Sequence, residues 1–243
     1  PYASDDMGTI ETVSALGRSD ILSSHRSALV RDRVVVSAVG DINADELSAL
    51  IDALLDGLPQ TSALSLLQPA KISLQSGIRV IDFPTPQSVA LFGHAGMDRD
   101  DPDFFAAYIL NYVFGVNGFE SRLMRELREN RGLTYGVNTY LVNSDYADLY
   151  IGQFASANER VSEAVEVLKA EWDKIATEGI TDEPLARAKT YLTGAYPLRF
   201  DGNAKIARIL AGMQLQGLDP SYIDTRNARI EAVSLAQARR VAA

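Results

Sequence analysis

The sequence predicts an α+β fold in which helices pack on one face of a largely antiparallel sheet. Two pairs of strand candidates lie in the chain, and a short turn rich in Pro, Thr, Asn, Ser or Asp joins the strands of each pair. Apolar residues at helical spacing follow each pair. Hairpins followed by successive helices are typical of α+β domains. Because 47% of the 243 residues are hydrophobic, the chain can bury the core that such a fold needs.

The N-terminal part of the chain predicts only a portion of such a unit. Residues 9–28 predict two short helices. The run over 33–39 is mostly apolar and β-branched, which predicts a strand buried on both faces. Asn43 and Glu46 predict a capping box for a helix that ends before Pro59. This arrangement resembles the closing portion of an α+β domain.

A change in composition predicts a linker in the middle of the chain. Residues 60–76 are rich in Ser, Gln, Leu and Pro and show no clear period. We therefore expect one domain portion over 1–59, a linker over 60–77 and a second domain over 78–243. The second domain is predicted to contain strands over 78–83 and 88–94, helices over 104–114 and 119–130, a hairpin over 133–142 and 146–154, and later helices that begin at Asn158, Thr181, Asn203 and Ser234.

Composition and charge exclude several classes of function. The chain has 23 basic and 32 acidic residues and a net charge of −9, which argues against binding to nucleic acid. It contains no cysteine, which excludes disulfides and Cys-ligated metals. The longest uncharged stretch, 104–119, is too short to cross a bilayer, so we expect no membrane span. The sequence begins at Pro1 in mid-phrase, and we expect a fragment or a processed chain.

The histidines predict no metal centre. A hydrolytic zinc site usually combines two His on one helical face with a nearby Glu. This chain has only His25 and His94, and neither belongs to an H-x-x-E-H or H-E-x-x-H arrangement. We interpret His25 as a helix-surface residue and His94 as a strand residue, with a His pair that meets a carboxylate in space as the minor alternative. We expect no metal site in this chain.

The strongest functional candidate is the corner between the second helix and the hairpin. Arg128 lies in the last helical turn, where a cation complements the helix dipole. Gly132 can adopt the left-handed conformation that turns the chain into the next strand, and Tyr135 is expected on the same face of that strand as Val137. A guanidinium beside a phenol is a donor pair suited to a carbonyl oxygen or an oxyanion. On spacing alone, the structural interpretation is favoured, with Arg128 as a helix-capping cation and Tyr135 as a core residue.

The residues of this corner resemble a known family. Ser121-Arg122-Leu123 and the run LRENRGLTYGV over 127–137 are similar to the second domain of the M16 metallopeptidases, which include pitrilysin, insulysin and the mitochondrial processing peptidases. The similarity extends over nearly the whole chain. Residues 8–41 resemble the close of the family's first domain, and residues 158–200 resemble the later helices of its second domain.

The resemblance implies a peptidase built from two homologous α+β halves that close around an unfolded peptide. One half would hold zinc through an H-x-x-E-H helix and a later Glu, and this sequence lacks that helix. The other half would supply an Arg and a Tyr, seven positions apart, that reach the substrate near the metal. Arg128 and Tyr135 match that spacing. Gly118, Ser121 and Arg122 are expected beside the bound peptide.

We therefore expect the non-zinc portion of an M16-type metallopeptidase, with 1–59 as the tail of the first domain and 78–243 as the inactive second domain. Alone it should not hydrolyse peptides. Zinc is expected in the missing half or in a partner subunit, within a homo- or heterodimer that binds a peptide substrate. Two alternatives stay open: a non-catalytic scaffold or assembly subunit of this family, and an unrelated α+β binding module. The resemblance favours a periplasmic location, with a cytoplasmic one as the alternative.

Overall fold

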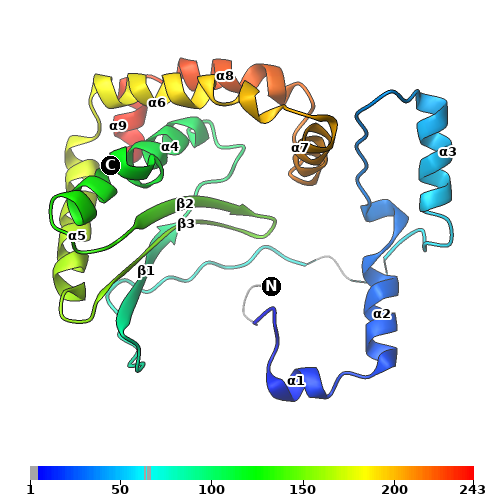
Figure 1. The fold of residues 1–243 in the computed structure, drawn as a ribbon, viewed down its shortest axis with the longest axis horizontal. Coiled ribbons are helices and arrows are strands. Elements are labelled where there is room, and N and C mark those ends of the chain that lie inside the picture. The colour runs from blue at the N-terminus through cyan, green and yellow to red at the C-terminus, as the bar shows by residue number, and fades with distance from the viewer. Residues whose placement is uncertain (1–4, 63, 65–66) are drawn as a thin grey trace. The chain divides into compact units, whose positions relative to one another are not determined.

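The structure is a computed structural model that describes residues 5–62, 64 and 67–243 (Figure 1). The chain forms two compact units. Unit 1 contains Pro1–Ala70 and Tyr196–Asp224, and unit 2 contains Lys71–Ala195 and Thr225–Ala243. The predicted linker over 60–77 includes the passage from one unit to the other at Ala70. The domain boundaries that the sequence predicts stay a prediction.

Unit 2 is built on a three-stranded antiparallel sheet in the order β1-β3-β2. The strands are β1 (Gln87–Ala95), β2 (Val137–Ser144) and β3 (Ala147–Ala157). In the register, Val137 of β2 lies opposite Phe154 of β3, and Ala90 of β1 lies opposite the same Phe154. The predicted hairpin is confirmed as a pair of antiparallel strands, although its first strand begins at Val137 and not at Leu133.

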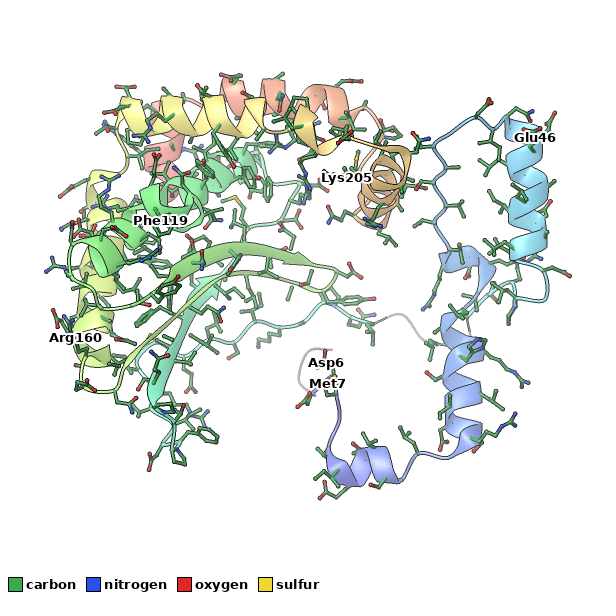
Figure 2. All side chains as sticks on the ribbon, in the orientation of Figure 1. Asp6, Met7, Glu46, Phe119, Arg160 and Lys205 are labelled. Atoms are coloured by element: carbon green, nitrogen blue, oxygen red, sulfur yellow. The ribbon has the colours of Figure 1, made fainter. Side chains whose placement is uncertain are left out.

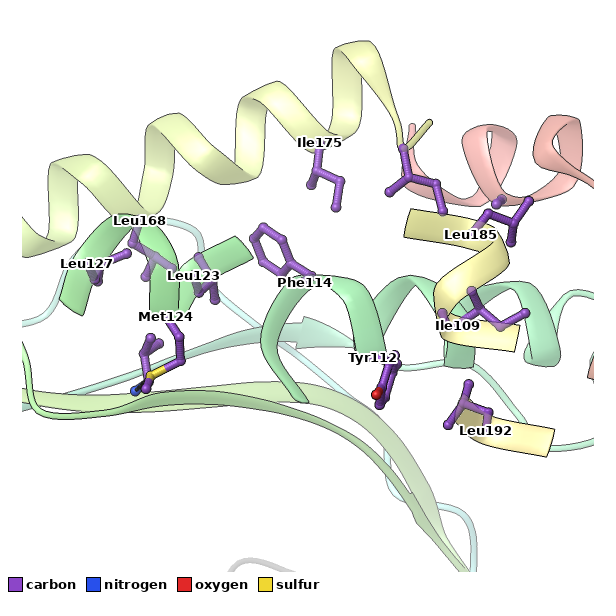
Figure 3. Packing of buried hydrophobic residues seen from close by; sticks show 14 of the residues in the cluster. Ile109, Tyr112, Phe114, Leu123, Met124, Leu127, Leu168, Ile175, Leu185 and Leu192 are labelled. Atoms are coloured by element: carbon purple, nitrogen blue, oxygen red, sulfur yellow. Dashed lines mark hydrogen bonds between the residues drawn. The ribbon is translucent and has the colours of Figure 1, made fainter. Parts of the chain in front are cut away.

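Helices cover one face of this sheet (Figure 1). Burial alternates along β2: Val137 and Thr139 are fully buried, whereas Asn138 and Tyr140, which follow them, are exposed. Figure 3 shows the apolar layer that this face shares with the helices, where Leu123 and Leu127 lie close to Leu168. The helices of this unit are α4 (Phe104–Asn111), α5 (Val161–Glu178), α6 (Asp182–Gly194), the later part of α8 (Tyr222–Ala232) and α9 (Leu235–Ala242). The predicted α+β class, with helices on one face of an antiparallel sheet, is confirmed.

Two segments of unit 2 form π-helical turns where the sequence predicted ordinary helix. They are Tyr112–Val116, which continues α4, and Met124–Glu129. In each, a backbone N–H binds the carbonyl five residues earlier, as in the bonds from Asn117 to Tyr112 (3.0 Å) and from Asn130 to Arg125 (2.9 Å). A short 3₁₀-helix, Gly118–Glu120, separates the two segments. The predicted helix over 119–130 is therefore shorter and wider than expected.

The helix predicted over 104–114 does not end before Gly115. Gly115 lies inside the π-helical turn, and a Cβ added to it would clash with the Thr139 side chain of β2. The helix needs glycine here because its backbone approaches the sheet closely, which no larger residue permits. Thr139 itself donates a hydrogen bond of 2.6 Å to Oδ1 of the buried Asn111.

Unit 1 contains α1 (Ile10–Ser14), α2 (Arg18–Ala28), α3 (Ala44–Leu54), α7 (Asn203–Leu215) and short 3₁₀-helices at Arg31–Arg33 and Pro197–Arg199. The capping box predicted for Asn43 and Glu46 is confirmed. The predicted strand over 33–39 is wrong, since these residues belong to no sheet. Gln214 of α7 donates to the Val36 carbonyl at 3.0 Å instead. A strand forms only beside a partner, and within the described part of unit 1 no strand lies beside it.

The strand predicted over 78–83 is also wrong. This segment is extended but pairs with no strand of the described sheet, and its apolar side chains are exposed. The exposed side chains include Ile78, Val80, Ile81 and Phe83. The β-branched residues of this segment favour an extended backbone, which the segment has. An extended segment becomes a strand only when it also forms hydrogen bonds with a neighbouring strand. Along the described residues, no helix is both long and apolar enough to cross a membrane.

Candidate functional site

The candidate site lies at the helix–strand corner, residues 127–137, where the second π-helical turn leads towards β2. Gly132 has a φ of +57°, the left-handed conformation that the sequence predicted for it. Its N–H binds the Arg128 carbonyl at 2.8 Å, and the N–H of Leu133 binds the Leu127 carbonyl at 2.7 Å. These bonds satisfy carbonyls that the end of the helix would otherwise leave free. The corner is therefore defined by its backbone.

Residues 133–136 do not continue β2, although the sequence predicted a strand from Leu133. Side chains hold this segment against β3 in place of the ladder. Ser156 Oγ donates to the Leu133 carbonyl at 2.6 Å, and Thr134 Oγ1 donates to the Ala155 carbonyl at 2.6 Å. Beyond the corner, Arg160 donates to the Gly132 carbonyl at 3.3 Å.

Tyr135 leaves the buried face because of this break. Its side chain is 86% exposed, whereas Val137, which was expected on the same face, is fully buried. The interpretation of Tyr135 as a core residue is therefore wrong. A segment fixed by its neighbours' side chains can present the residue between them to solvent, which a residue inside a pleated strand over a core cannot do.

The structure brings Arg128 and Tyr135 together. The guanidinium carbon of Arg128 lies 4.7 Å from the centroid of the Tyr135 ring. The same carbon lies 4.3 Å from the centroid of the Phe119 ring, which the short 3₁₀-helix Gly118–Glu120 carries (Figure 2). The Arg128 side chain is 25% exposed, and its Nε lies 3.6 Å from Glu129 Oε1. A cation stacked on aromatic faces is attracted by the ring quadrupoles.

This arrangement suits the recognition of a carbonyl oxygen. The two rings contact the guanidinium through their faces, and an aromatic face does not take up an N–H donor as a carboxylate does. The phenol adds a further O–H donor at the rim of its ring. Two donors on an exposed corner can bind one oxygen atom and stabilise negative charge that develops on it.

The three residues predicted beside a bound peptide lie one turn before the corner. Gly118 has a φ of +50° and opens the 3₁₀-helix. Ser121 is fully buried, and its Oγ donates to the Gly118 carbonyl at 3.0 Å and accepts from the Met124 N–H at 3.3 Å. Ser121 therefore caps the following helix. The contact of these residues with a peptide stays a prediction.

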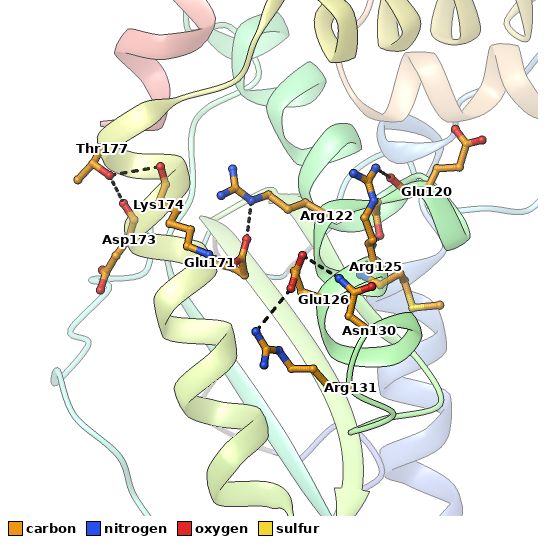
Figure 4. Close-up of polar contacts among 12 residues, drawn as sticks. Glu120, Arg122, Arg125, Glu126, Asn130, Arg131, Glu171, Asp173, Lys174 and Thr177 are labelled. Atoms are coloured by element: carbon orange, nitrogen blue, oxygen red, sulfur yellow. Dashed lines mark hydrogen bonds and ion pairs between the residues drawn. The ribbon is translucent and has the colours of Figure 1, made fainter.

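Arg122 points to a buried carboxylate. Its Nε donates to Glu171 Oε2 at 2.6 Å, and Lys174 Nζ donates to Glu171 Oε1 at 2.6 Å (Figure 4). The Glu171 side chain is 4% exposed. Burial would raise the pKa of this carboxyl, but the hydrogen bonds from Lys174 and Arg122 outweigh it and hold the pKa below its ordinary value. Arg122 thus links the predicted peptide segment to α5.

A charged groove with a volume of about 490 Å³ lies over this ion pair. Its walls come from the segment between Tyr112 and Glu126, from α5 and from the start of α6. Four acidic and four basic side chains line it, and two of them, Arg187 and Glu120, form an ion pair. The groove therefore has no excess of either charge.

An aromatic cavity of about 150 Å³ lies elsewhere in unit 2, between β1, α4, α5 and α9. The His94 ring stacks on Tyr150 with centroids 5.2 Å apart, and Trp172 meets both rings edge-on. Burial raises the pKa of Tyr150 to about 12. His94 is therefore a strand residue in an aromatic cluster, and His25 lies on α2 of unit 1. In the described ranges, no group of three or more His, Cys, Asp or Glu could hold a metal ion.

Comparison with known proteins places the corner within a family. A family model described as the peptidase M16 inactive domain matches residues 15–192. An uncharacterised zinc protease of Streptomyces coelicolor is 28% identical over 244 residues, which cover 97% of this chain and 52% of that protein. A non-peptidase homolog of Helicobacter pylori is 26% identical over 201 residues, which cover 82% of this chain and 46% of that protein. The chain thus spans about half the length of the curated relatives it matches.

The fold agrees with a solved structure of the same kind. The crystal structure of a peptidase M16 inactive domain from Pseudomonas fluorescens matches with a TM-score of 0.88 and 26% identity, over 99% of this chain and 57% of that one. Arg128 and Tyr135 both lie inside the range that the family model matches. Since that range is more than half of the chain, the protein belongs to the M16 peptidase family and matches its inactive domain.

Proposed function

We propose that this chain is the non-zinc portion of an M16-type zinc metallopeptidase and that it helps to bind the peptide substrate. In this proposal, Arg128 and Tyr135 donate hydrogen bonds to the carbonyl oxygen of the bond to be cleaved. The observation that carries it is the contact between the two side chains at an exposed corner. A core tyrosine and a helix-capping arginine would not need to meet there.

The chemistry of peptide hydrolysis explains why these two side chains suit the role. The carbonyl oxygen gains negative charge when a nucleophile attacks, and preorganised donors stabilise that charge more than they stabilise the ground state. A guanidinium and a phenol at one corner are such donors. The described residues do not fit a zinc ion, so the zinc and the water that it activates would belong to another half or subunit.

The proposed protein therefore works as an assembly. The chain alone does not hydrolyse peptides, and a homologous zinc-bearing domain or subunit completes the site in a homo- or heterodimer. The match to an inactive domain and the length of the relatives, about twice that of this chain, support a partner half of similar size.

The test uses the complete zinc-bearing assembly and a fluorogenic peptide. We expect Arg128→Ala and Tyr135→Phe each to lower kcat by about 100- to 1,000-fold with little change in KM, because each removes a donor used mainly in the transition state. Arg125→Ala and Tyr140→Phe are matched controls, since they remove an exposed arginine and an exposed phenol nearby. Full turnover in both Arg128→Ala and Tyr135→Phe would show that the pair is not catalytic.

A second candidate function is that of a non-catalytic assembly subunit. The relative from Helicobacter pylori that is named a non-peptidase homolog supports it. In that case, Arg128 and Tyr135 would only stabilise the corner. An assembly that contains zinc but cleaves no member of a diverse peptide library would favour this candidate over the first.

A further inference from the structure

We propose that Phe119 is a positioning residue that sets the plane of the Arg128 guanidinium. This inference rests on the proposed role of Arg128 in binding the substrate carbonyl. Sequence patterns did not single out Phe119 for any function. Its contact with Arg128 becomes visible only in the folded corner, where the ring centroid lies 4.3 Å from the guanidinium carbon.

Packing in the core does not explain the position of Phe119. Its side chain is 62% exposed, although the neighbouring Leu123 and Leu127 are fully buried. The backbone around it is fixed, because Ser121 Oγ and the Ser121 N–H both bind the Gly118 carbonyl, at 3.0 and 3.2 Å. The exposed Phe119 ring is therefore carried on a hydrogen-bonded turn, with its face against the Arg128 guanidinium. This contact favours one orientation of the guanidinium.

The type of contact matters for a residue that must bind a carbonyl. A carboxylate partner would orient Arg128 by consuming two of its N–H donors. An aromatic face orients the same group without using any donor, because the attraction acts on the face and the donors lie in the plane. The Nε of Arg128 lies 3.6 Å from Oε1 of the half-exposed Glu129, and this distance is too long for a good hydrogen bond. Phe119 therefore restricts the guanidinium and leaves its donors available.

Tyr135 cannot supply this restraint by itself. Its side chain is 86% exposed, and its ring centroid lies 4.7 Å from the guanidinium carbon, which is farther than that of Phe119. Phe119 comes from the turn that precedes the π-helical segment Met124–Glu129 in the chain, whereas Tyr135 follows that segment. Two rings, one from the turn before the π-helical segment and one from the residues after it, define the orientation of the Arg128 guanidinium better than either ring alone.

The experiment uses the complete zinc-bearing assembly. We expect Phe119→Leu to lower kcat by about two- to fivefold with KM unchanged, the size of an exposed cation–π contact. Phe119→Tyr should restore turnover, because it keeps the aromatic face. In an Arg128→Ala background, Phe119→Leu should cause no further loss. Val116→Ala is the control, because it shortens another exposed apolar side chain three residues before Phe119, and it should leave turnover unchanged.

A spectroscopic measurement separates positioning from general support of the fold. The ring current of Phe119 should shift the side-chain resonances of Arg128 upfield, and Phe119→Leu should remove that shift. If Phe119→Leu lowers turnover equally with and without Arg128, or if it has no effect where Arg128→Ala does, the positioning role is overturned and the proposed function stands. If Arg128→Ala keeps full turnover, the proposed function itself fails, and the positioning role of Phe119 fails with it.

Discussion

The hydroxyl of Thr134 donates a hydrogen bond of 2.6 Å to the carbonyl oxygen of Ala155, at the point where β2 would otherwise have continued beside β3. The same hydroxyl accepts from the N–H of Gly136 at 3.2 Å. One side chain therefore replaces part of the ladder and holds the segment that carries Tyr135. Together with the bond from Ser156 to the Leu133 carbonyl, it fixes the path of the residues before Val137 along the sheet.

We expect Thr134→Val to destabilise the protein by about 1–2 kcal/mol, because the buried hydroxyl is replaced by a methyl group and the Ala155 carbonyl loses its donor. Turnover of the assembly should also fall, since Tyr135 loses its defined position. Urea unfolding and peptide hydrolysis measure the two effects. Thr134→Ser keeps the hydroxyl and is the control. Normal turnover in Thr134→Val would show that Tyr135 is positioned by other contacts.

Tyr135→Ala should change the free energy of unfolding by less than about 0.5 kcal/mol, since the side chain is 86% exposed. Leu127→Ala, eight residues earlier in the same corner, should cost about 2–5 kcal/mol because Leu127 is fully buried. Chemical denaturation followed by circular dichroism compares the two variants. A large loss of stability in Tyr135→Ala would mean that Tyr135 supports the fold.

Gly115→Ala should destabilise the protein by about 2–3 kcal/mol, because the added methyl group would overlap Thr139 and push the π-helical turn away from β2. Gly136→Ala is the control: a Cβ there meets nothing within 4 Å and the φ is not positive. Thermal unfolding of both variants provides the measurement. Equal melting temperatures would show that the helix can move away from the sheet at no cost.

Glu171→Gln should destabilise the protein by about 2 kcal/mol at neutral pH, because it removes the charge that Arg122 and Lys174 bind. The folded-state pKa of Glu171 is lowered, so its stabilisation is present above the ordinary value of 4.5 and is lost as the pH falls through the folded-state pKa. The difference in unfolding free energy between the wild type and the variant should therefore shrink in acid.

Urea unfolding at a series of pH values measures this difference. Glu178→Gln changes a carboxylate that lines the same groove and serves as the control. A difference that stays constant down to the lowest pH would contradict the assignment of the lowered pKa to Glu171.

Local signals in the sequence predicted the elements that depend on near neighbours. The capping box at Asn43, the helix that begins at Ser234 and the left-handed Gly132 formed as expected, because each is settled within a few residues. The strands predicted over 33–39 and 78–83 failed, because pairing depends on a distant partner.

The candidate site was predictable in part. Spacing and resemblance identified Arg128 and Tyr135, and the structure brings them together. Spacing could not show that Tyr135 is exposed, since this follows from the bonds that Thr134 and Ser156 make with their neighbours. Phe119 was missed because its contact depends on the π-helical turn before Arg128, and apolar spacing alone predicts an ordinary helix there.

The wide turn over Met124–Glu129 also bears on how this chain is aligned with its relatives. Deleting one residue between Ser121 and Arg128 would allow an ordinary α-helix to form. Because the wide turn absorbs one extra residue, which corresponds to about 100° of α-helical rotation, an α-helix without that residue would present the arginine in nearly the same direction. Homologues that are one position shorter here would therefore keep both the fold and the direction of that side chain, and the gap in such an alignment belongs inside the wide turn.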